Sequence, residues 1–452
     1  MGAGGTSARP HQLDGAPRPS LALHDAIALV LGIVIGAGIF RAPSAVAASA
    51  PGVAAIVAAW IAGGVVSIAG AMCYAELAAT YPHAGGDYHF LSRALGRPTA
   101  FLFAWARLTV IPTGSVALLG FVFGDYAADL LGAPAASGPL AAAMVLVLTL
   151  VNAAGLRVAR GVQNVLTIAL VLGLVAVIVT GFSLPPAPPP AAPTPARPAF
   201  GLAMVFVLLA YGGWNEAAYV STELRGGRRA IATALVGALL LVTLLYVLAN
   251  VAYLRGLGVD GVRGSSAVAA DLLARGLGPA GAIAIAAIVM AAVITSANAT
   301  LLMGSRMVWA FGRDFPPFGP LGRWSARASS PVNAILLQGA IALVLVGLGI
   351  SSRRGFEAMV AYTAPVFWLF FLLTGVSLFV LRRRDPAAAR PFRVPFYPAT
   401  PALFCATCAF LLWSSLVYAG PGAIAGVAVL ATGLAPMWFS LRRAPARPSA
   451  AA

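Results

Sequence analysis

Twelve long apolar runs follow one another along this chain, separated by short segments rich in arginine, proline and glycine. A helix of about 20 apolar residues crosses the hydrocarbon core of a bilayer. Only 9% of the 452 residues are charged, whereas soluble proteins carry about 25%. The sequence therefore predicts an all-α polytopic membrane protein with twelve transmembrane helices. The predicted spans are 26–48, 53–80, 99–127, 139–155, 162–183, 200–224, 230–253, 279–312, 331–350, 357–381, 399–418 and 422–441.

The basic residues orient these spans. All 29 are arginines, and with a cytoplasmic N-terminus 20 of them fall in inner segments and 6 in outer segments. Cytoplasmic loops of membrane proteins carry such an excess of positive charge. The predicted location is the cell inner membrane with both termini cytoplasmic. The arginines that produce the net charge of +16 are distributed as the membrane topology requires, so we expect no nucleic-acid partner.

The runs and their connections predict an order of segments along the chain. The cysteines Cys73, Cys405 and Cys408 all lie in apolar runs and form no disulfide framework or metal motif. Residues 256–278 form an outer loop in which 265–276 fit a short amphipathic helix, either a lid or a plain connector. The predicted segments are a disordered cytoplasmic tail at 1–23, a first five-helix repeat at 24–183, a proline-rich extracellular loop at 184–199, a second, inverted five-helix repeat at 200–384, helices 11 and 12 at 385–442, and a cytoplasmic tail at 443–452.

Two of the predicted spans are interrupted by paired glycines. GIVIGAGIFRAP places Gly36 and Gly38 inside the first span, and AYGGWNE places Gly212 and Gly213 inside the sixth. Each is the first helix of a five-helix block. Interruptions at matching positions of two halves indicate a transporter binding site at the bilayer midplane, although single glycines also mark close helix packing.

The chemistry of a broken helix predicts what binds there. In hydrocarbon, unpaired backbone groups are costly and survive only where protein or water covers them. The N-terminus of a half-helix attracts a carboxylate, and carbonyls left at a helix end attract an ammonium group or a sodium ion. One solute that carries both charges on a single carbon is an α-amino acid.

The motifs resemble those of the amino acid–polyamine–organocation (APC) superfamily of permeases, over nearly the whole chain beyond the N-terminal tail. The matching stretches are GIVIGAGIF, CYAELAATYPHAGGDYHFLSRALGRPTAFLFAW, AYGGWNEAAYVSTELR, the segment from Asn298 to Asp314, and RRRDPAAARPFRVPFYP. The helix 6 motif is most similar to that of L-type amino acid transporters. The resemblance implies the LeuT-type fold, a 5+5 inverted repeat with helices 1 and 6 broken at midplane.

The same resemblance assigns the substrate-binding residues. Backbone amides of Gly36, Ala37 and Gly38 would hold the substrate carboxylate. Trp214 and Asn215 would line or gate the pocket beside the glycines Gly212 and Gly213. The carbonyls that would hold the amino group are those near Ile33, Ile35, Leu209, Ala210 and Tyr211.

The chain departs from its relatives at three places. Leu209 stands where many L-type relatives have an aromatic gate, and Leu170 where many carry a lysine. The outer loop at 128–138 lacks the cysteine with which eukaryotic L-type chains bind a heavy subunit, so we expect no disulfide-linked partner. The missing lysine directs attention to Ala292, Thr295 and Ser296, whose spacing resembles a sodium site. The alternative is that Thr295 and Ser296 bond back to their own helix or pack between helices.

Charged residues within spans are costly and often functional. Glu216 follows the helix 6 break and is a candidate proton carrier or contact for a cationic substrate; the alternative is a cap of the lower half-helix. Arg41 and Glu357 are expected to form an outer gate, with snorkelling of Arg41 as the alternative. Glu76 and Glu223 are expected in ion pairs near inner helix ends.

These features predict secondary transport of amino acids, most simply neutral L-amino acids, by alternating access. The coupling is to H⁺, to Na⁺ or to exchange. The alternatives are a cationic amino acid or polyamine permease that uses Glu216, and an amino acid sensor. We expect neither an enzyme nor a cofactor, because His11, His24, His83 and His89 form no catalytic or metal constellation. The expected partners are the substrate, the lipid bilayer and a coupling ion, and the sequence leaves the oligomeric state open.

Overall fold

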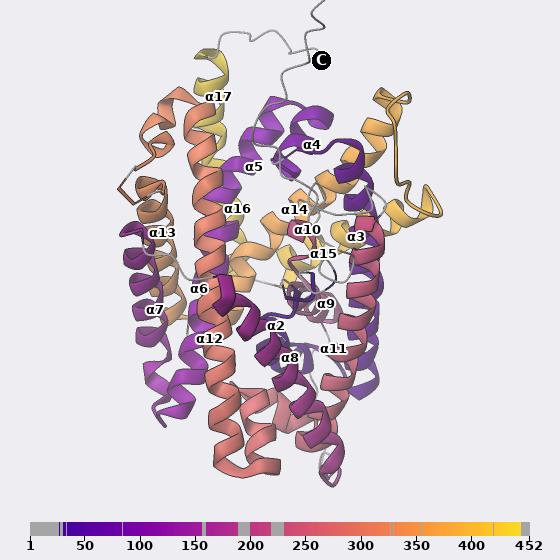
Figure 1. Ribbon diagram of the computed structural model, residues 1–452, viewed down its shortest axis with the longest axis vertical. Helices are drawn as coiled ribbons and strands as arrows, with labels where there is room; N and C mark the ends of the chain where they lie inside the picture. Colours follow the sequence, from indigo (N-terminus) through magenta and orange to yellow (C-terminus); the bar gives the residue numbers. More distant parts are fainter. Residues whose placement is uncertain are drawn as a thin grey trace, which may run out of the picture.

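The computed structural model is a bundle of α-helices whose long axis runs vertically in Figure 1. It describes residues 27, 30–32 and 34–443, apart from gaps at 84, 156–159, 189–198, 218–229, 326, 329, 353 and 419. The predicted tails therefore lie outside the described residues, as does most of the proline-rich loop. The helices are α2 (Gly38–Ser49), α3 (Val53–Thr80), α4 (Asp87–Leu95), α5 (Arg97–Thr109), α6 (Ile111–Leu130), α7 (Ser137–Ala153), α8 (Arg160–Ser183), α9 (Phe200–Ala210), α10 (Trp214–Ala217), α11 (Ala230–Gly264), α12 (Val268–Asp314), α13 (Val332–Ser351), α14 (Gly355–Arg384), α15 (Ala399–Tyr418), α16 (Pro421–Thr432) and α17 (Leu434–Arg443), with short 3₁₀ helices η1 (Pro134–Ala136) and η3 (Pro316–Gly322).

Ten helical segments among the described residues are long and apolar enough to cross a membrane. They account for ten of the predicted spans, and α3 has the predicted bounds. The remaining two, 26–48 and 200–224, contain the interruptions, and their described helices α2 and α9 are only 12 and 11 residues long. The chain is an all-helical, multi-pass membrane protein.

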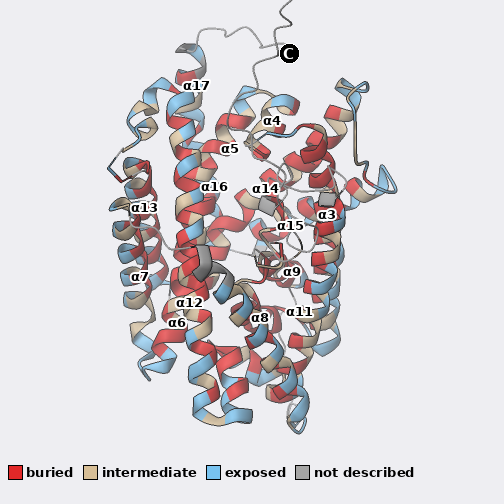
Figure 2. Cartoon of the chain, viewed as in Figure 1, coloured by how far each residue is buried: buried red, intermediate tan, exposed pale blue. Residues whose placement is uncertain are grey.

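Burial follows the pattern of a protein surrounded by lipid. In Figure 2 buried residues concentrate between the helices, and exposed ones face outward. Many exposed side chains are large and apolar, such as Val147 on α7, Val165 on α8 and Leu244 on α11, each more than half exposed. Apolar side chains on the outer surface of a bundle fit a hydrocarbon environment, whereas water would disfavour them.

Several predicted boundaries are wrong because glycine and proline bend helices without ending them. The loop expected at 256–278 is largely helical: α11 continues to Gly264 across a kink at Gly258, and α12 starts at Val268 and kinks at Gly278. The expected helix within 265–276 is therefore the first part of α12. The span expected at 422–441 corresponds to one spanning segment, Pro421–Ser440, within which Gly433 separates α16 from α17. The loop before α5 contains a helix, α4, that was not predicted.

The two ends of the bundle are named here by their landmarks. The α4 end, at the top of Figure 1, holds α4 and the end of α17. The hairpin end, at the bottom, is where α11 connects to α12. The interrupted helices α2 and α9 lie between these ends and pack against each other, with α11 beside α2.

Candidate functional site at the interrupted helices

The first interruption leaves a bare helix N-terminus. Residues 35–37 are not helical, and α2 begins at Gly38 without any side-chain cap or acidic residue in its first turn. The first N–H groups of a helix have no acceptor within the helix. The amide of Gly36 bonds to the carbonyl of Val34 at 2.9 Å, so this short turn is internally closed. The uncapped start of α2 is therefore the feature able to bind an anion.

The second interruption lies between α9 and α10. Helix α9 ends at Ala210, and Tyr211, Gly212 and Gly213 form a turn before α10 begins at Trp214. Gly213 has φ +100°, a left-handed conformation that favours glycine. Within this turn the amide of Gly212 donates to the carbonyl of Leu209 at 3.1 Å, and the carbonyl of Ala210 lies at the end of α9.

The structure brings the two interruptions into direct contact. A Cβ atom on Gly38 would lie only 2.8 Å from Cα of Ala210, so the two helices approach too closely for any other residue. The hydroxyl of Tyr246, on α11, lies 3.0 Å from the carbonyl oxygen of Val34 and 3.3 Å from that of Ala210. One buried hydroxyl thus faces a carbonyl from each broken helix.

Tyr246 was missed by the sequence analysis. Tyrosine in an apolar run gives no signal of its own, and the hydroxyl finds its acceptors only when α11 lies beside both breaks. It belongs to an aromatic cluster with Trp60 and Tyr211, whose ring centroids lie 5.0 to 6.0 Å apart. The Tyr211 hydroxyl donates to the carbonyl of Trp60 at 2.9 Å, which holds the turn after α9 against α3.

The residues that follow the second interruption, on α10, lie toward the α4 end. Trp214 is buried against Tyr74 and Phe371, with ring centroids 5.2 and 5.6 Å apart. Asn215 is buried and lines a small cavity of about 20 Å³. Leu209 is half-buried. On this side of the breaks, aromatic side chains therefore fill most of the space.

Two predicted residues fall outside what the structure describes. Ile33 lies outside the described residues, and the Glu216 side chain is likewise undescribed, although its backbone belongs to α10. Their assigned roles stay predictions.

The candidate sodium ligands lie on α12, whose Thr295 is buried. Its hydroxyl lies 2.7 Å from the carbonyl oxygen of Ala291 and 3.1 Å from that of Ala292. Thr295 thus bonds back to its own helix, which is the alternative that the sequence left open, and Ser296 is half-buried beside it. The sodium site stays a prediction. Among the described residues no group of three or more His, Cys, Asp or Glu side chains could hold a metal.

Arg41 lies one turn after the first interruption, toward the hairpin end. Its Nη2 atom lies 3.3 Å from Oε1 of Glu357, the partner expected from the sequence, and its Nε lies 3.1 Å from Oδ2 of Asp125. Asp125 on α6 was not singled out by sequence, because its role depends on how α6 packs on α2. Ser137 donates to the other oxygen of Asp125 at 2.6 Å. We call Arg41, Asp125 and Glu357 the Arg41 cluster.

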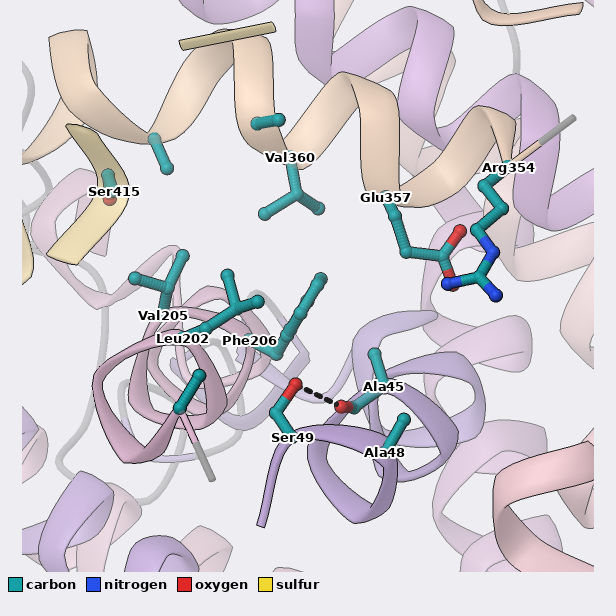
Figure 3. Close-up of a pocket in the computed structure, with 13 residues that line it drawn as sticks. Ala45, Ala48, Ser49, Leu202, Val205, Phe206, Arg354, Glu357, Val360 and Ser415 are labelled. Atoms are coloured by element: carbon teal, nitrogen blue, oxygen red, sulfur yellow. Dashed lines mark hydrogen bonds between the residues drawn. The ribbon is translucent and has the colours of Figure 1, made fainter. Parts of the chain in front are cut away.

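Two cavities adjoin this cluster. One, of about 550 Å³, is lined by all three members of the cluster together with Arg263 and Ser265. The other, of about 320 Å³, is shown in Figure 3, where Glu357 and Arg354 lie at one end and Leu202, Val205 and Phe206 lie below Val360.

At the α4 end a second ion cluster holds the helices together. Glu76 on α3 is almost completely buried and accepts hydrogen bonds from Nε of Arg382 at 2.7 Å and from the backbone amide of Val394 at 2.6 Å. Nε of Arg390 lies 3.7 Å from the same carboxylate. We call these residues the Glu76 cluster. Glu223, which was expected in a similar pair, lies outside the described residues.

Two histidines, His83 and His89, lie before and within α4. The rings of His83 and His89 stack with centroids 4.3 Å apart. Burial, with smaller contributions from His83 and Arg93, lowers the pKa of His89 to about 4. His89 is therefore neutral near pH 7.

A membrane-embedded helical bundle in which two interrupted helices are in contact is typical of secondary transporters. Residues 21–435 match the amino acid permease family, and the chain belongs to this family. It is 31% identical to the human b(0,+)-type amino acid transporter 1 over 419 residues, which cover 88% of this chain and 82% of that protein. It is 30% identical to the human large neutral amino acids transporter small subunit 2 over 461 residues, covering 97% of this chain and 84% of that protein. The mouse form of the latter is also 30% identical, over 94% of this chain and 81% of the relative.

Proposed function

We propose that this permease carries neutral L-amino acids across the cytoplasmic membrane by alternating access. The observation that carries the proposal is the contact between the two interruptions, where Gly38 at the uncapped start of α2 packs against Ala210 at the end of α9 and the Tyr246 hydroxyl faces the Val34 and Ala210 carbonyls. A carboxylate suits the first and an ammonium group the second. Family membership and the names of the relatives point to the same class of substrate.

We propose the twelve-span, 5+5 inverted-repeat arrangement for the whole chain, with repeats at 24–183 and 200–384 and both termini cytoplasmic. Ten spanning segments and the two short, interrupted helices α2 and α9 together make twelve. With this orientation the hairpin end is extracellular and the α4 end cytoplasmic. The arginine asymmetry supports that direction.

Within the site, we assign the substrate carboxylate to the amides of Ala37 and Gly38, and to that of Gly36 once its bond to the Val34 carbonyl opens. The amino group then faces the carbonyls of Ile35, Ala210 and their neighbours Ile33, Leu209 and Tyr211, while Trp214 and Asn215 close the α4 side. Recognition by backbone alone serves the part of the molecule that all α-amino acids share. We propose a neutral side chain for the substrate, the class that the name of the large neutral amino acids transporter relative gives.

Gly36→Ala gives a sharp test of this assignment. A Cβ atom on Gly36 would lie 4.0 Å from its nearest neighbour, so a methyl group fits the protein itself. That methyl group would occupy the space through which a carboxylate reaches the amides. We expect uptake of labelled L-leucine into proteoliposomes to fall at least about tenfold, the loss expected when a charge-assisted hydrogen bond is removed.

The control is Gly347→Ala, because a Cβ atom at Gly347 on α13 meets nothing within 4 Å and the residue lies far from both breaks. Both variants should unfold at the wild-type temperature. Wild-type uptake by purified Gly36→Ala protein would contradict backbone recognition at this position.

Coupling is tested in the same proteoliposomes with a sodium gradient, a pH gradient or internal amino acid alone. If sodium drives uptake, Thr295→Ala should raise the sodium concentration needed for half-maximal rate, and Ser296→Ala should do the same. Sodium independence would remove the sodium site and leave H⁺ coupling or exchange.

We also propose that the chain works without a disulfide-linked subunit, although one of its relatives is named a small subunit. The segment 128–138 has no cysteine, and Cys73, Cys405 and Cys408 all lie within helices as free thiols. Transport by the purified single chain tests this. Loss of activity on purification, restored by a co-purifying protein, would contradict it.

A further inference from the structure

One aromatic side chain projects away from the rest of the bundle. Phe396 lies in the connection between α14 and α15, which Figure 1 shows at the upper right edge. Its exposed fraction is 85%, the highest among the large apolar side chains of the described residues. Its φ is +53°, a conformation that bulky residues rarely adopt. The connection therefore presents a large apolar side chain outside the helical packing.

The backbone on either side of Phe396 is held in place. Two residues before it, the amide of Val394 donates to the buried Glu76 carboxylate at 2.6 Å. The carbonyl of Phe396 itself accepts the amide of Ala399, at the start of α15, at 2.7 Å. The ring of Tyr397, the next residue, packs against side chains of α14. The exposure of Phe396 thus belongs to an ordered segment that is bonded on both sides.

The position of Phe396 along the chain indicates what covers it. The membrane-spanning segment Ala399–Val417 begins three residues after Phe396. On α15 the exposed apolar side chains include Leu403, Phe410 and Trp413, at spacings of seven and three residues, which place them on one helix face. Phe396 precedes Leu403 by seven residues. It therefore lies where the lipid-facing stripe of α15 meets the end of the span.

The same connection carries positive charge. Arg383 and Arg393 are exposed, and neither forms an ion pair with another residue in the part of the chain that the structure describes. The nearby carboxylate of Asp385 is engaged by Arg93 at 3.2 Å. An apolar ring flanked by free arginines is the combination that binds the interface of a bilayer, where acyl chains and phosphate groups meet.

We propose that Phe396 is a membrane anchor. Its ring inserts between the acyl chains of the leaflet at the α4 end, while Arg393 pairs with lipid phosphates. The anchor depends on the bilayer and not on the substrate, so it does not rest on the proposed function. Only Pro395 separates Phe396 from the amide that binds Glu76. Insertion of the ring therefore helps to hold the Val394 amide on Glu76.

The depth of residue 396 in the bilayer is the direct test. A nitroxide label is attached to Phe396→Cys in nanodiscs of phosphatidylglycerol and phosphatidylcholine, with Cys73, Cys405 and Cys408 replaced by alanine. Collision rates with oxygen and with a water-soluble nickel chelate should place the label about 5–10 Å inside the interface. The control is Ala387→Cys, at an exposed residue of the same connection, whose label should stay in water.

Hydrogen exchange of the Val394 amide tests the link to Glu76. Phe396→Ser removes the ring but little packing within the protein, because the side chain is 85% exposed. In nanodiscs the Val394 amide should exchange about tenfold faster in this variant, measured by mass spectrometry of the peptide that contains it. Phe396→Leu keeps an apolar side chain and should exchange at the wild-type rate, as should Ala387→Ser.

The remaining outcomes contradict the proposal. A label at residue 396 that collides with the nickel chelate as often as the label at Ala387 does would show that water surrounds it. A label shielded from both oxygen and the nickel chelate would show that protein covers it, such as a second copy of this chain. Either result would overturn the anchor. Exchange of the Val394 amide at the wild-type rate in Phe396→Ser would overturn the link to Glu76.

Discussion

Both ends of the bundle are held by buried arginine–carboxylate contacts, but the two clusters are built differently. At the α4 end, the Glu76 carboxylate accepts from Arg382 and the Val394 amide at 2.6 to 2.7 Å, with Arg390 close by. At the hairpin end, one arginine is shared between two acids at 3.1 and 3.3 Å, and its Nη1 has no hydrogen-bond partner in the part of the chain that the structure describes.

The difference lies in how completely each charge is satisfied. Breaking a buried pair is costly because it leaves an uncompensated charge, and that cost is largest where every partner is in place. The Glu76 cluster is therefore expected to hold the helices of the α4 end firmly together. The Arg41 cluster borders a large cavity and has an unused donor, so its partners can be exchanged. This contrast predicts that the hairpin end opens more readily than the α4 end.

The largest effect is expected at Glu76. Glu76→Gln removes the carboxylate between two arginines and should lower the free energy of unfolding by about 3 kcal/mol or more. Thermal unfolding in detergent measures the loss. The control is Asp385→Asn, because its contact with Arg93 at 3.2 Å is partly exposed and should contribute less than about 1 kcal/mol. Equal losses in the two variants would show that the Glu76 cluster stabilises the fold no more than a partly exposed ion pair does.

At Arg41 we expect a smaller loss of stability than at Glu76 but a larger change in access to the interruptions. Arg41→Gln should destabilise the protein by about 1–2 kcal/mol, because Asp125 and Glu357 keep only weaker partners. In the Arg41→Gln background, Leu209→Cys should react about tenfold faster with an impermeant maleimide added from the hairpin side than it does without Arg41→Gln. The reason is that each 1.4 kcal/mol is a tenfold change. An unchanged labelling rate would show that the Arg41 cluster does not control access to the interruptions.

Tyr246→Phe tests the element midway between the two ends. The change removes the only hydrogen that the hydroxyl offers to the Val34 and Ala210 carbonyls, and stability should fall by about 1 kcal/mol. L-leucine affinity should fall with it, because the carbonyls lose their orientation. The matched control is Tyr253→Phe on the same helix, whose buried hydroxyl has no hydrogen-bond partner among the described residues. A larger loss in Tyr253→Phe would contradict the bridging role.

The smallest effect concerns pH at the α4 end. His89 has a pKa of about 4 in the folded protein and about 6.5 when unfolded. Between these values the unfolded state binds the extra proton, so stability falls as pH falls from about 6.5 to 4. The unfolding temperature of His89→Gln should decline less over this range than that of wild type. Identical pH profiles would show that His89 is not held neutral by its surroundings.

Sequence predicted the spans well because hydropathy is a property of each run, independent of its neighbours. It also located both interruptions, since paired glycines followed by polar residues are legible without a structure. Boundaries failed where Gly258 and Gly278 bend helices that then continue. A glycine permits the backbone to depart from helical geometry, but the contacts of the neighbouring residues decide whether the helix ends there.

The contacts within the site depended on tertiary packing that sequence does not contain. Glu357 could be matched to Arg41 because the predicted topology places both residues on the outer side of the membrane. Asp125 and Tyr246 have no such signal, since acids and tyrosines on several helices were equally placed. The free donor on Arg41 is visible only once all the neighbours of the guanidinium are known.

The contact between Gly38 and Ala210 has a kinematic consequence. Because there is no room for even a methyl group between the two backbones, α2 and α9 can neither slide past each other nor approach further without collision. They can still rotate, because glycine presents a smooth surface at that point. The crossing is therefore a pivot: a small rotation about it moves the Arg41 end of α2 in one direction and the far side of the break in the other. In the alternating-access cycle proposed above, a pivot at this residue would couple the opening of one end to the closing of the other.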